Sequence, residues 1–86
     1  MTLLGNYPNP AKDYTNINFS LSSGSGVTIT MMNMAGQTVS TIHEGNLSSG
    51  PHAIPVSTAN IPAGDYIYII QAASGTGLAG KMTVIR

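Results

Sequence analysis

Several residue types are absent or scarce in this 86-residue chain. It contains no cysteine and no tryptophan, and only three basic and three acidic residues. Without cysteine, no disulfide can form, and no thiolate is present to bind a metal or attack a substrate. The polar surface must therefore come from Ser, Thr, Asn, Gly and Gln, a palette common in extracellular β-proteins.

The scarcity of charge excludes one class of partner. The formal net charge is zero, and the three cations, Lys12, Lys81 and Arg86, are scattered along the chain. Binding to nucleic acid requires a basic stripe that displaces counterions from phosphates. The sequence therefore predicts no nucleic-acid partner.

Long apolar runs are also missing. No segment approaches the roughly 20 apolar residues of a membrane-spanning helix, so we expect no transmembrane segment. The opening MTLLGNYPNP lacks the basic start and long apolar stretch of a signal peptide. An export signal is therefore expected upstream, and residues 1–5 are interpreted as linker residues or as residues added ahead of the natural sequence.

The patterns that are present indicate strands. No segment of helical length carries an apolar period of 3.6 residues free of Gly and Pro, whereas short alternating segments recur between turn residues. This spacing predicts a single all-β domain over residues 1–86, an Ig-like antiparallel β-sandwich of about seven short strands, with a small closed barrel as the alternative. The expected strands are 3–7, 15–21, 27–31, 37–44, 51–56, 65–72 and 78–86.

Alternation within these segments predicts which residues face the core. Pro51 and Pro55 place their strand at a sheet edge, because proline cannot donate to a ladder. Val39 and Ile42 are out of phase, which indicates a bulge. Segment 65–72 is apolar on both faces and is expected to be central. The predicted inward residues are Ile17, Phe19, Leu21, Val27, Ile29, Met31, Ile54, Val56, Met82 and Val84.

The titratable residues form no convincing reactive site. If loop 45–50 closes a regular hairpin, His43 and His52 become opposed, but no third metal ligand is evident. The carboxylates, Asp13, Glu44 and Asp65, lie at predicted turns or strand ends, where solvation keeps them ordinary. We therefore expect no metal, no cofactor and no catalysis.

Three motifs are interpreted as determinants of the fold. In YPNP, two prolines set a rigid turn and the Tyr7 ring is expected to pack. In NMAGQ, glycine supplies the positive φ of a hairpin turn. In PAGDY, a stiff turn precedes a tyrosine whose hydroxyl is expected to find a backbone partner. The residues concerned are Tyr7, Pro8, Asn9, Pro10, Gly36, Pro62, Gly64 and Tyr66.

The last segment, LAGKMTVIR, is the candidate for recognition. Its alternation predicts a strand, and basic residues, Lys81 and Arg86, bracket its end. Such a positive patch beside the terminal carboxylate could be read electrostatically by a receptor. The charge pattern alone is equally compatible with a strand that merely completes the sandwich.

Four segments stand out in order along the chain: NYPNPAKDYTNINFSL (6–21), MMNMAGQTV (31–39), NIPAGDYIYII (60–70) and GKMTVIR (80–86). Together they resemble a known family, the type A C-terminal sorting domains of the type IX secretion system. Asn33, Ile61, Asp65 and Arg86 depart mildly from the Asp, Leu, aliphatic and Lys residues that are usual in that family. This family resemblance implies that the recognition residues are Lys81, Met82, Thr83, Val84, Ile85 and Arg86.

The resemblance implies a non-catalytic address label. In Bacteroidota such a domain ends a larger secreted protein, folds in the periplasm, and is recognised by the outer-membrane translocon. A surface sortase then removes it and releases the cargo or attaches it to the cell surface. The expected partners are thus the translocon, the sortase and an upstream cargo domain, and the domain itself is expected to be a monomer.

Two other functions remain open at the level of sequence. A carbohydrate-binding accessory module would use Tyr7 and Tyr14, which lie near turns, although tryptophan is absent and Tyr66 and Tyr68 share a face that is expected to be buried. A structural spacer would pair through an exposed edge, against which the proline-bearing strand argues.

Overall fold

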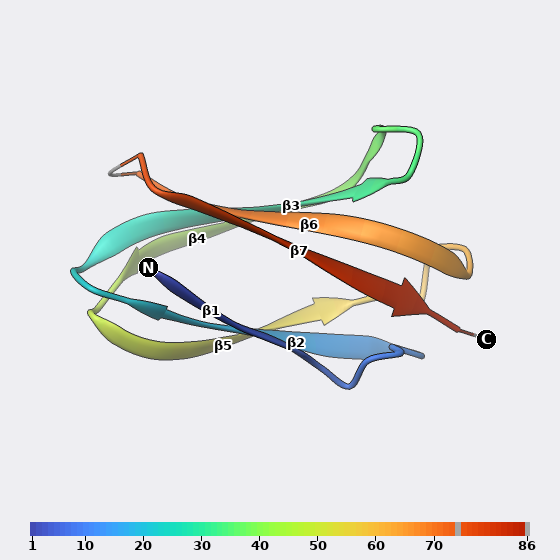
Figure 1. Cartoon of the computed structure of the whole chain (residues 1–86), viewed down its shortest axis with the longest axis horizontal. Helices are drawn as coiled ribbons and strands as arrows, with labels where there is room; N and C mark the ends of the chain where they lie inside the picture. Colours follow the sequence, from blue (N-terminus) through green and yellow to red (C-terminus); the bar gives the residue numbers. More distant parts are fainter. Residues whose placement is uncertain (74, 86) are drawn as a thin grey trace.

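The chain is a sandwich of two antiparallel sheets (Figure 1). The computed structural model describes residues 1–73 and 75–85. Across these residues the chain forms seven strands and no helix. The strands are β1 (Thr2–Tyr7), β2 (Tyr14–Leu21), β3 (Ser25–Asn33), β4 (Thr38–Leu47), β5 (Gly50–Ser57), β6 (Gly64–Ala72) and β7 (Gly77–Val84).

The strands divide into a three-stranded and a four-stranded layer. The first has the order β1-β2-β5 and the second the order β4-β3-β6-β7, and neighbouring strands pair antiparallel. The two sheets stack face to face in Figure 1. The predicted sandwich is therefore confirmed and the closed barrel is wrong. The sequence also placed segment 65–72 correctly, because β6 lies between two strands.

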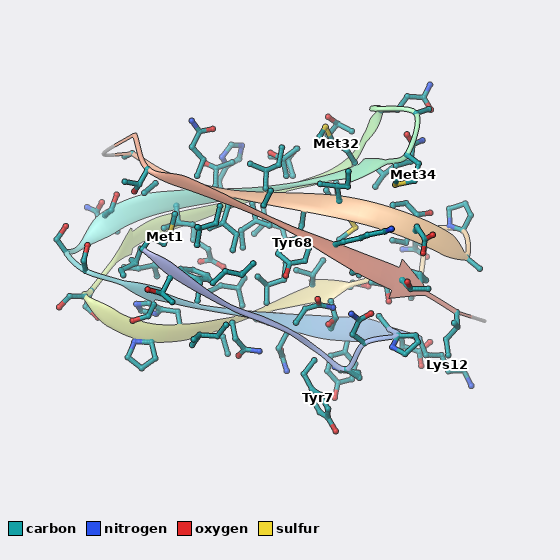
Figure 2. The ribbon with its side chains drawn as sticks, in the orientation of Figure 1. Met1, Tyr7, Lys12, Met32, Met34 and Tyr68 are labelled. Carbon is teal, nitrogen blue, oxygen red and sulfur yellow. The ribbon has the colours of Figure 1, made fainter. Side chains whose placement is uncertain are left out.

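The core lies between the two layers and contains every residue predicted to face inward. Alternate side chains of β2, β3 and β6 are buried, as the strand period of two requires. Tyr68 extends from β6 into the space between the sheets (Figure 2) and is 1% exposed. The buried apolar residues are Ala11, Ile17, Phe19, Leu21, Val27, Ile29, Met31, Ile54, Val56, Tyr66, Tyr68, Ile70, Ala72, Met82 and Val84.

The connection from β4 to β5 differs from the expectation. Segment 45–50 does not close a hairpin, because β4 pairs with β3 and β5 pairs with β2. Strand β4 extends to Leu47, and Ser48 and Ser49 carry the chain from one sheet to the other. His43 consequently lies opposite Thr28, and His52 lies opposite Phe19. The predicted juxtaposition of the two histidines is therefore wrong.

All four edge strands carry a feature that disfavours pairing with another chain. Strand β1 has a bulge at Leu4, and β4 has bulges at Val39 and Gly45. The Val39 bulge is the one that the sequence predicted. Strand β5 contains Pro51 and Pro55 and is an edge strand, also as predicted. The end of β7 is covered by the segment that joins β1 to β2. Bulges, prolines and covering segments are the usual protections of sheet edges.

Candidate recognition site

The predicted recognition segment is divided by the alternation of β7. Met82 and Val84 are each 1% exposed and pack in the core. Lys81 and Ile85 are exposed and Thr83 is half-buried, so these three present their side chains away from the core. Arg86 lies outside the described residues. Of the described residues in the segment, only Lys81, Thr83 and Ile85 are therefore accessible to a partner.

Thr83 is held on three sides. Its hydroxyl donates a hydrogen bond to Oδ1 of Asp65 on β6, at 2.9 Å. Its backbone N–H donates to Oδ1 of Asn9, at 3.2 Å, and its carbonyl accepts from the N–H of Ala11, at 2.8 Å. The N–H of Ile85 donates to the carbonyl of Ala11, also at 2.8 Å. The free edge of β7 is thus occupied at its end by residues from the start of the chain.

The segment that makes these contacts, residues 8–13, is here called the strap. It connects β1 to β2 and lies beside the end of β7 (Figure 1). On its other side the strap is fixed by two fully buried threonines. Thr15 donates its hydroxyl proton to the carbonyl of Pro8 at 2.8 Å. Thr58 donates its N–H to the carbonyl of Asp13 and its hydroxyl to that of Lys12.

The hydrogen bonds from these two buried threonines to the strap have a clear physical reason. A buried hydroxyl without a partner costs free energy, so it must find a hydrogen bond. The strap carbonyls provide that bond for Thr15 and Thr58, which are both 0% exposed. No buried side-chain polar atom in the described part of the chain lacks a partner. The strap is consequently tied to both sheets, and Ala11 at its centre is itself 0% exposed.

Tyr7 departs from its predicted role. Its ring is 75% exposed and extends away from the body of the molecule (Figure 2). Because Tyr7 pairs with Asn16, the pleat places its side chain on the outer face of the three-stranded sheet. The prediction that this ring packs is wrong. Within YPNP, the contacts to β7 come instead from Asn9, which the sequence indicated only as part of a turn.

The PAGDY motif supports the same part of β7. Tyr66 is 4% exposed and donates its hydroxyl proton to the carbonyl of Pro62, which confirms the predicted backbone partner. Tyr66 pairs with Met82, and Gly64, with φ of +153°, pairs with Val84. The sequence treated Asp65 as a departure from the family pattern, but its carboxylate is the group that holds the Thr83 hydroxyl.

The turn motif lies at this end of the sandwich as well. Gly36 has φ of +85°, which confirms its predicted role. Oδ1 of Asn33 accepts the N–H groups of Ala35 and Gln37, and Asn33 pairs with Tyr66 across the β3–β6 ladder. The turn, the start of β6, the strap and the end of β7 all lie on the right of Figure 1. Motifs that are far apart in the sequence therefore lie at the same end of the sandwich as the last residues of β7.

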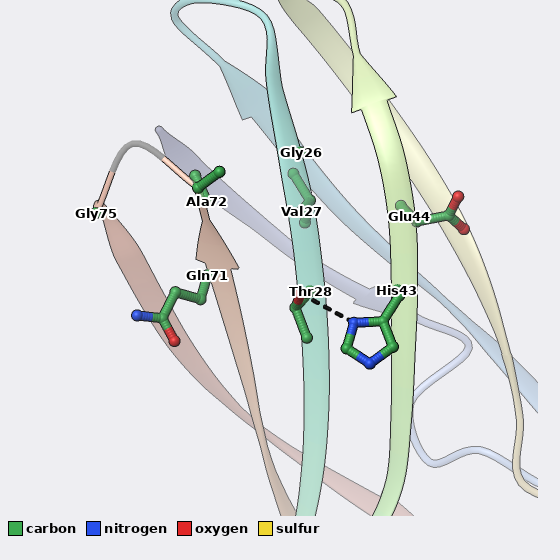
Figure 3. A pocket seen from close by; sticks show the side chains of 9 residues that line it. Gly26, Val27, Thr28, His43, Glu44, Gln71, Ala72 and Gly75 are labelled. Carbon is green, nitrogen blue, oxygen red and sulfur yellow. Dashed lines mark hydrogen bonds between the residues drawn. The ribbon is translucent and has the colours of Figure 1, made fainter.

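A surface hollow lies elsewhere and involves none of the predicted recognition residues. It has a volume of about 480 Å³, and its polar side chains include Thr28, His43, Glu44 and Gln71. Nδ1 of His43 lies 3.3 Å from Oγ1 of Thr28, whereas Glu44 extends in a different direction from β4 (Figure 3). Across residues 1–73 and 75–85, no group of three His, Asp or Glu residues could hold a metal ion.

Two further properties concern titration and membranes. Burial raises the pKa of the Tyr68 hydroxyl above its ordinary value, because the charged form would lose its hydration. In the part of the chain that the structure describes, no helix is long and apolar enough to span a membrane.

Comparison with known families identifies the chain. The family described as "secretion system C-terminal sorting domain" matches residues 6–85. The chain belongs to this family. No curated protein matches the chain at a significant level. The match covers all four motif segments, apart from Arg86, and it confirms the resemblance to the type IX sorting domains.

Membership of the family assigns a function. The sorting domain is a signal of the type IX secretion system, and it implies a cargo protein, the secretion machinery, and export to the cell surface or the extracellular space. The family is non-catalytic. The carbohydrate-binding alternative is not favoured, although Tyr7 and Tyr14 are exposed as that alternative required.

Proposed function

We propose that the secretion machinery reads the end of the sorting domain through the outward side chains of Lys81, Thr83 and Ile85, together with Arg86, which lies outside the described residues. The observation that carries this proposal is the alternation along β7 and Ile85, which buries Met82 and Val84 and leaves Lys81, Thr83 and Ile85 accessible. Met82 and Val84 then contribute to recognition indirectly, by anchoring the strand in the core.

Membership of the family supports the following partners and route. The outer-membrane translocon binds the folded domain after transit through the periplasm, and a surface sortase removes it from the cargo. The domain has no catalytic activity of its own, acts as one unit over residues 1–86, and is a monomer. The protected edges of β1, β4, β5 and β7 support the monomeric state. Pairing of Thr2 and Leu3 with β2 supports including the first residues in the domain.

A secretion assay tests this function. Residues 1–86 are fused behind a reporter that carries an export signal, and the fusion is expressed in a bacterium with an active type IX system. We expect the reporter at the cell surface or in the medium. Accumulation of a folded fusion in the periplasm would show that the chain is not a sufficient sorting signal.

Single substitutions locate the signal more sharply than truncation. Deletion of residues 81–86 removes Met82 and Val84 from the core, so lost export would be confounded by unfolding. Lys81→Gln removes one exposed charge and leaves the core intact. It is expected to reduce export, whereas Glu44→Gln, which also removes one charge but lies on β4, outside the strap and β7, is expected to leave export unchanged. Equal export of both variants would contradict a role for Lys81.

A further inference from the structure

We propose that Asn9 is a positioning residue for the recognition strand, and that the strap is the template on which the end of β7 is held. This inference rests on the proposed function, because it assigns the strap the task of presenting Lys81, Thr83 and Ile85 in one fixed arrangement. It joins two motifs that are 74 residues apart in the sequence.

The contacts are arranged as a clamp. The edge-facing N–H of Thr83 donates a hydrogen bond to the Asn9 amide oxygen. The edge-facing carbonyl of Thr83 accepts a hydrogen bond from the Ala11 N–H. The carbonyl of Ala11 accepts a hydrogen bond from the N–H of Ile85, and this bond completes a short parallel bridge between Ala11 and Val84. Asn9 is the exposed member of this clamp, and Ala11 is the buried one. Asn9 can therefore be changed without disturbing the core.

The strap is suited to act as a template because it is fixed without help from β7. Thr15 on β2 and Thr58, which follows β5, bind its carbonyls from within the three-stranded layer. The side chain of Asn6 also donates to Oγ1 of Thr15, at 3.3 Å. Strand β7, in contrast, is the last strand of the other sheet and pairs along its ladder with β6 alone. The strap thus supplies hydrogen-bonding partners on the second edge of β7, along which no strand pairs with it.

Occupation of this edge determines how a partner can read the strand. Extended peptides often bind by adding a strand to a free sheet edge, where main-chain groups provide the affinity. At Thr83 both edge-facing main-chain groups are already bonded to the strap. At this end of β7 a partner therefore contacts the outward side chains and not the main-chain edge, and it meets Asn9 of the strap beside them.

Amide exchange tests the clamp directly in the isolated domain. Asn9→Ala removes the acceptor and is expected to increase the exchange rate of the Thr83 N–H about fivefold, the effect of one hydrogen bond of ordinary strength. Asn9→Asp retains an acceptor oxygen and is expected to keep the wild-type rate. Asn16→Ala, an outward-facing change on β2, is the control and is also expected to keep it. An unchanged Thr83 rate in Asn9→Ala would overturn the inference.

The same variants, placed in the secretion fusion, test the consequence for recognition. Asn9→Ala is expected to reduce export of a folded fusion, and Asn9→Asp is expected to restore it. If Asn9→Ala accelerates exchange at Thr83 but exports as wild type does, the clamp has no role in recognition and the inference fails. If the wild-type fusion is not exported at all, the proposed function fails, while the exchange rates still decide whether Asn9 positions β7.

Discussion

Gly80 on β7 faces Tyr68 on β6 directly across the ladder, and the Tyr68 ring covers the position that a Cβ at residue 80 would occupy. A Cβ built there would overlap Cζ and the hydroxyl oxygen of Tyr68 and would lie 2.6 Å from its Cε2. The same hydroxyl reaches across the sandwich to Oδ1 of Asn6 on β1, at 3.4 Å. The absence of a side chain at Gly80 thus allows Tyr68 to connect the two sheets.

Gly80→Ala should destabilise the domain strongly. The methyl group cannot fit unless the Tyr68 ring moves, and overpacking of a core typically costs about 1–3 kcal/mol. Thermal unfolding of the variant is expected at a markedly lower temperature than that of wild type. Gly45→Ala is the matched control, because a Cβ at Gly45 meets no atom within 4 Å and its φ is not in the left-handed region. Equal loss of stability in both variants would contradict the packing account.

Stability should fall at alkaline pH in a way that depends on Tyr68. Burial raises the pKa of this hydroxyl in the folded state, so the folded protein retains the proton at pH values where the unfolded chain has lost it. Its contribution is complete below the ordinary tyrosine pKa of about 10 and is lost as the pH rises through the folded value. In urea unfolding between pH 8 and about 11, Tyr68→Phe is expected to lose less stability than wild type does. Parallel pH profiles would refute this origin of the alkaline loss.

Removal of the Asn33 side chain should loosen the β3–β4 turn. Its amide oxygen accepts two backbone N–H groups, from Ala35 at 3.0 Å and from Gln37 at 2.9 Å. Asn33→Ala is expected to cost about 1–2 kcal/mol in the free energy of unfolding. Asn33→Asp keeps both acceptor bonds and loses only the exposed bond that Nδ2 donates to Oε1 of Gln37, so it is expected to cost about 0.5 kcal/mol or less. Chemical denaturation of the three proteins decides the matter, and a large cost for Asn33→Asp would indicate that the amide group itself is required.

Substitutions of Met82 and of Ile85 should differ in their effects on stability and export, although both residues belong to the predicted recognition segment. Met82 is 1% exposed, so Met82→Ala is expected to cost about 2–5 kcal/mol in stability. Met82→Leu conserves volume and should cost less than about 1.5 kcal/mol while preserving export. Ile85 is 44% exposed, so Ile85→Ala should cost about 1 kcal/mol or less but lower export. Loss of export by a stable Met82→Leu variant would indicate that Met82 is read directly.

The sequence by itself determined the fold class and the faces that β2, β3, β5 and β7 bury. Alternation is a local property with a period of two residues, so segments such as Val27–Met31 and Ile54–Val56 could be assigned without knowing their neighbours. The edge position of β5 followed from its prolines, and the bulge in β4 followed from the phase of Val39 and Ile42. These features depend on residues within a few positions of one another.

Only the tertiary structure decided which distant segments meet. Nothing local distinguishes a hairpin at 45–50 from the crossing between sheets that is observed, because both need only a short polar connection. The exposure of Tyr7 follows from its register against β2, and the fit of Gly80 to Tyr68 follows from the register of β7 against β6. The bond from Thr83 to Asn9 depends on how both sheets place their ends. Such pairings depend on the packing of the whole chain, whereas the composition and the period of a strand are properties of its own few residues.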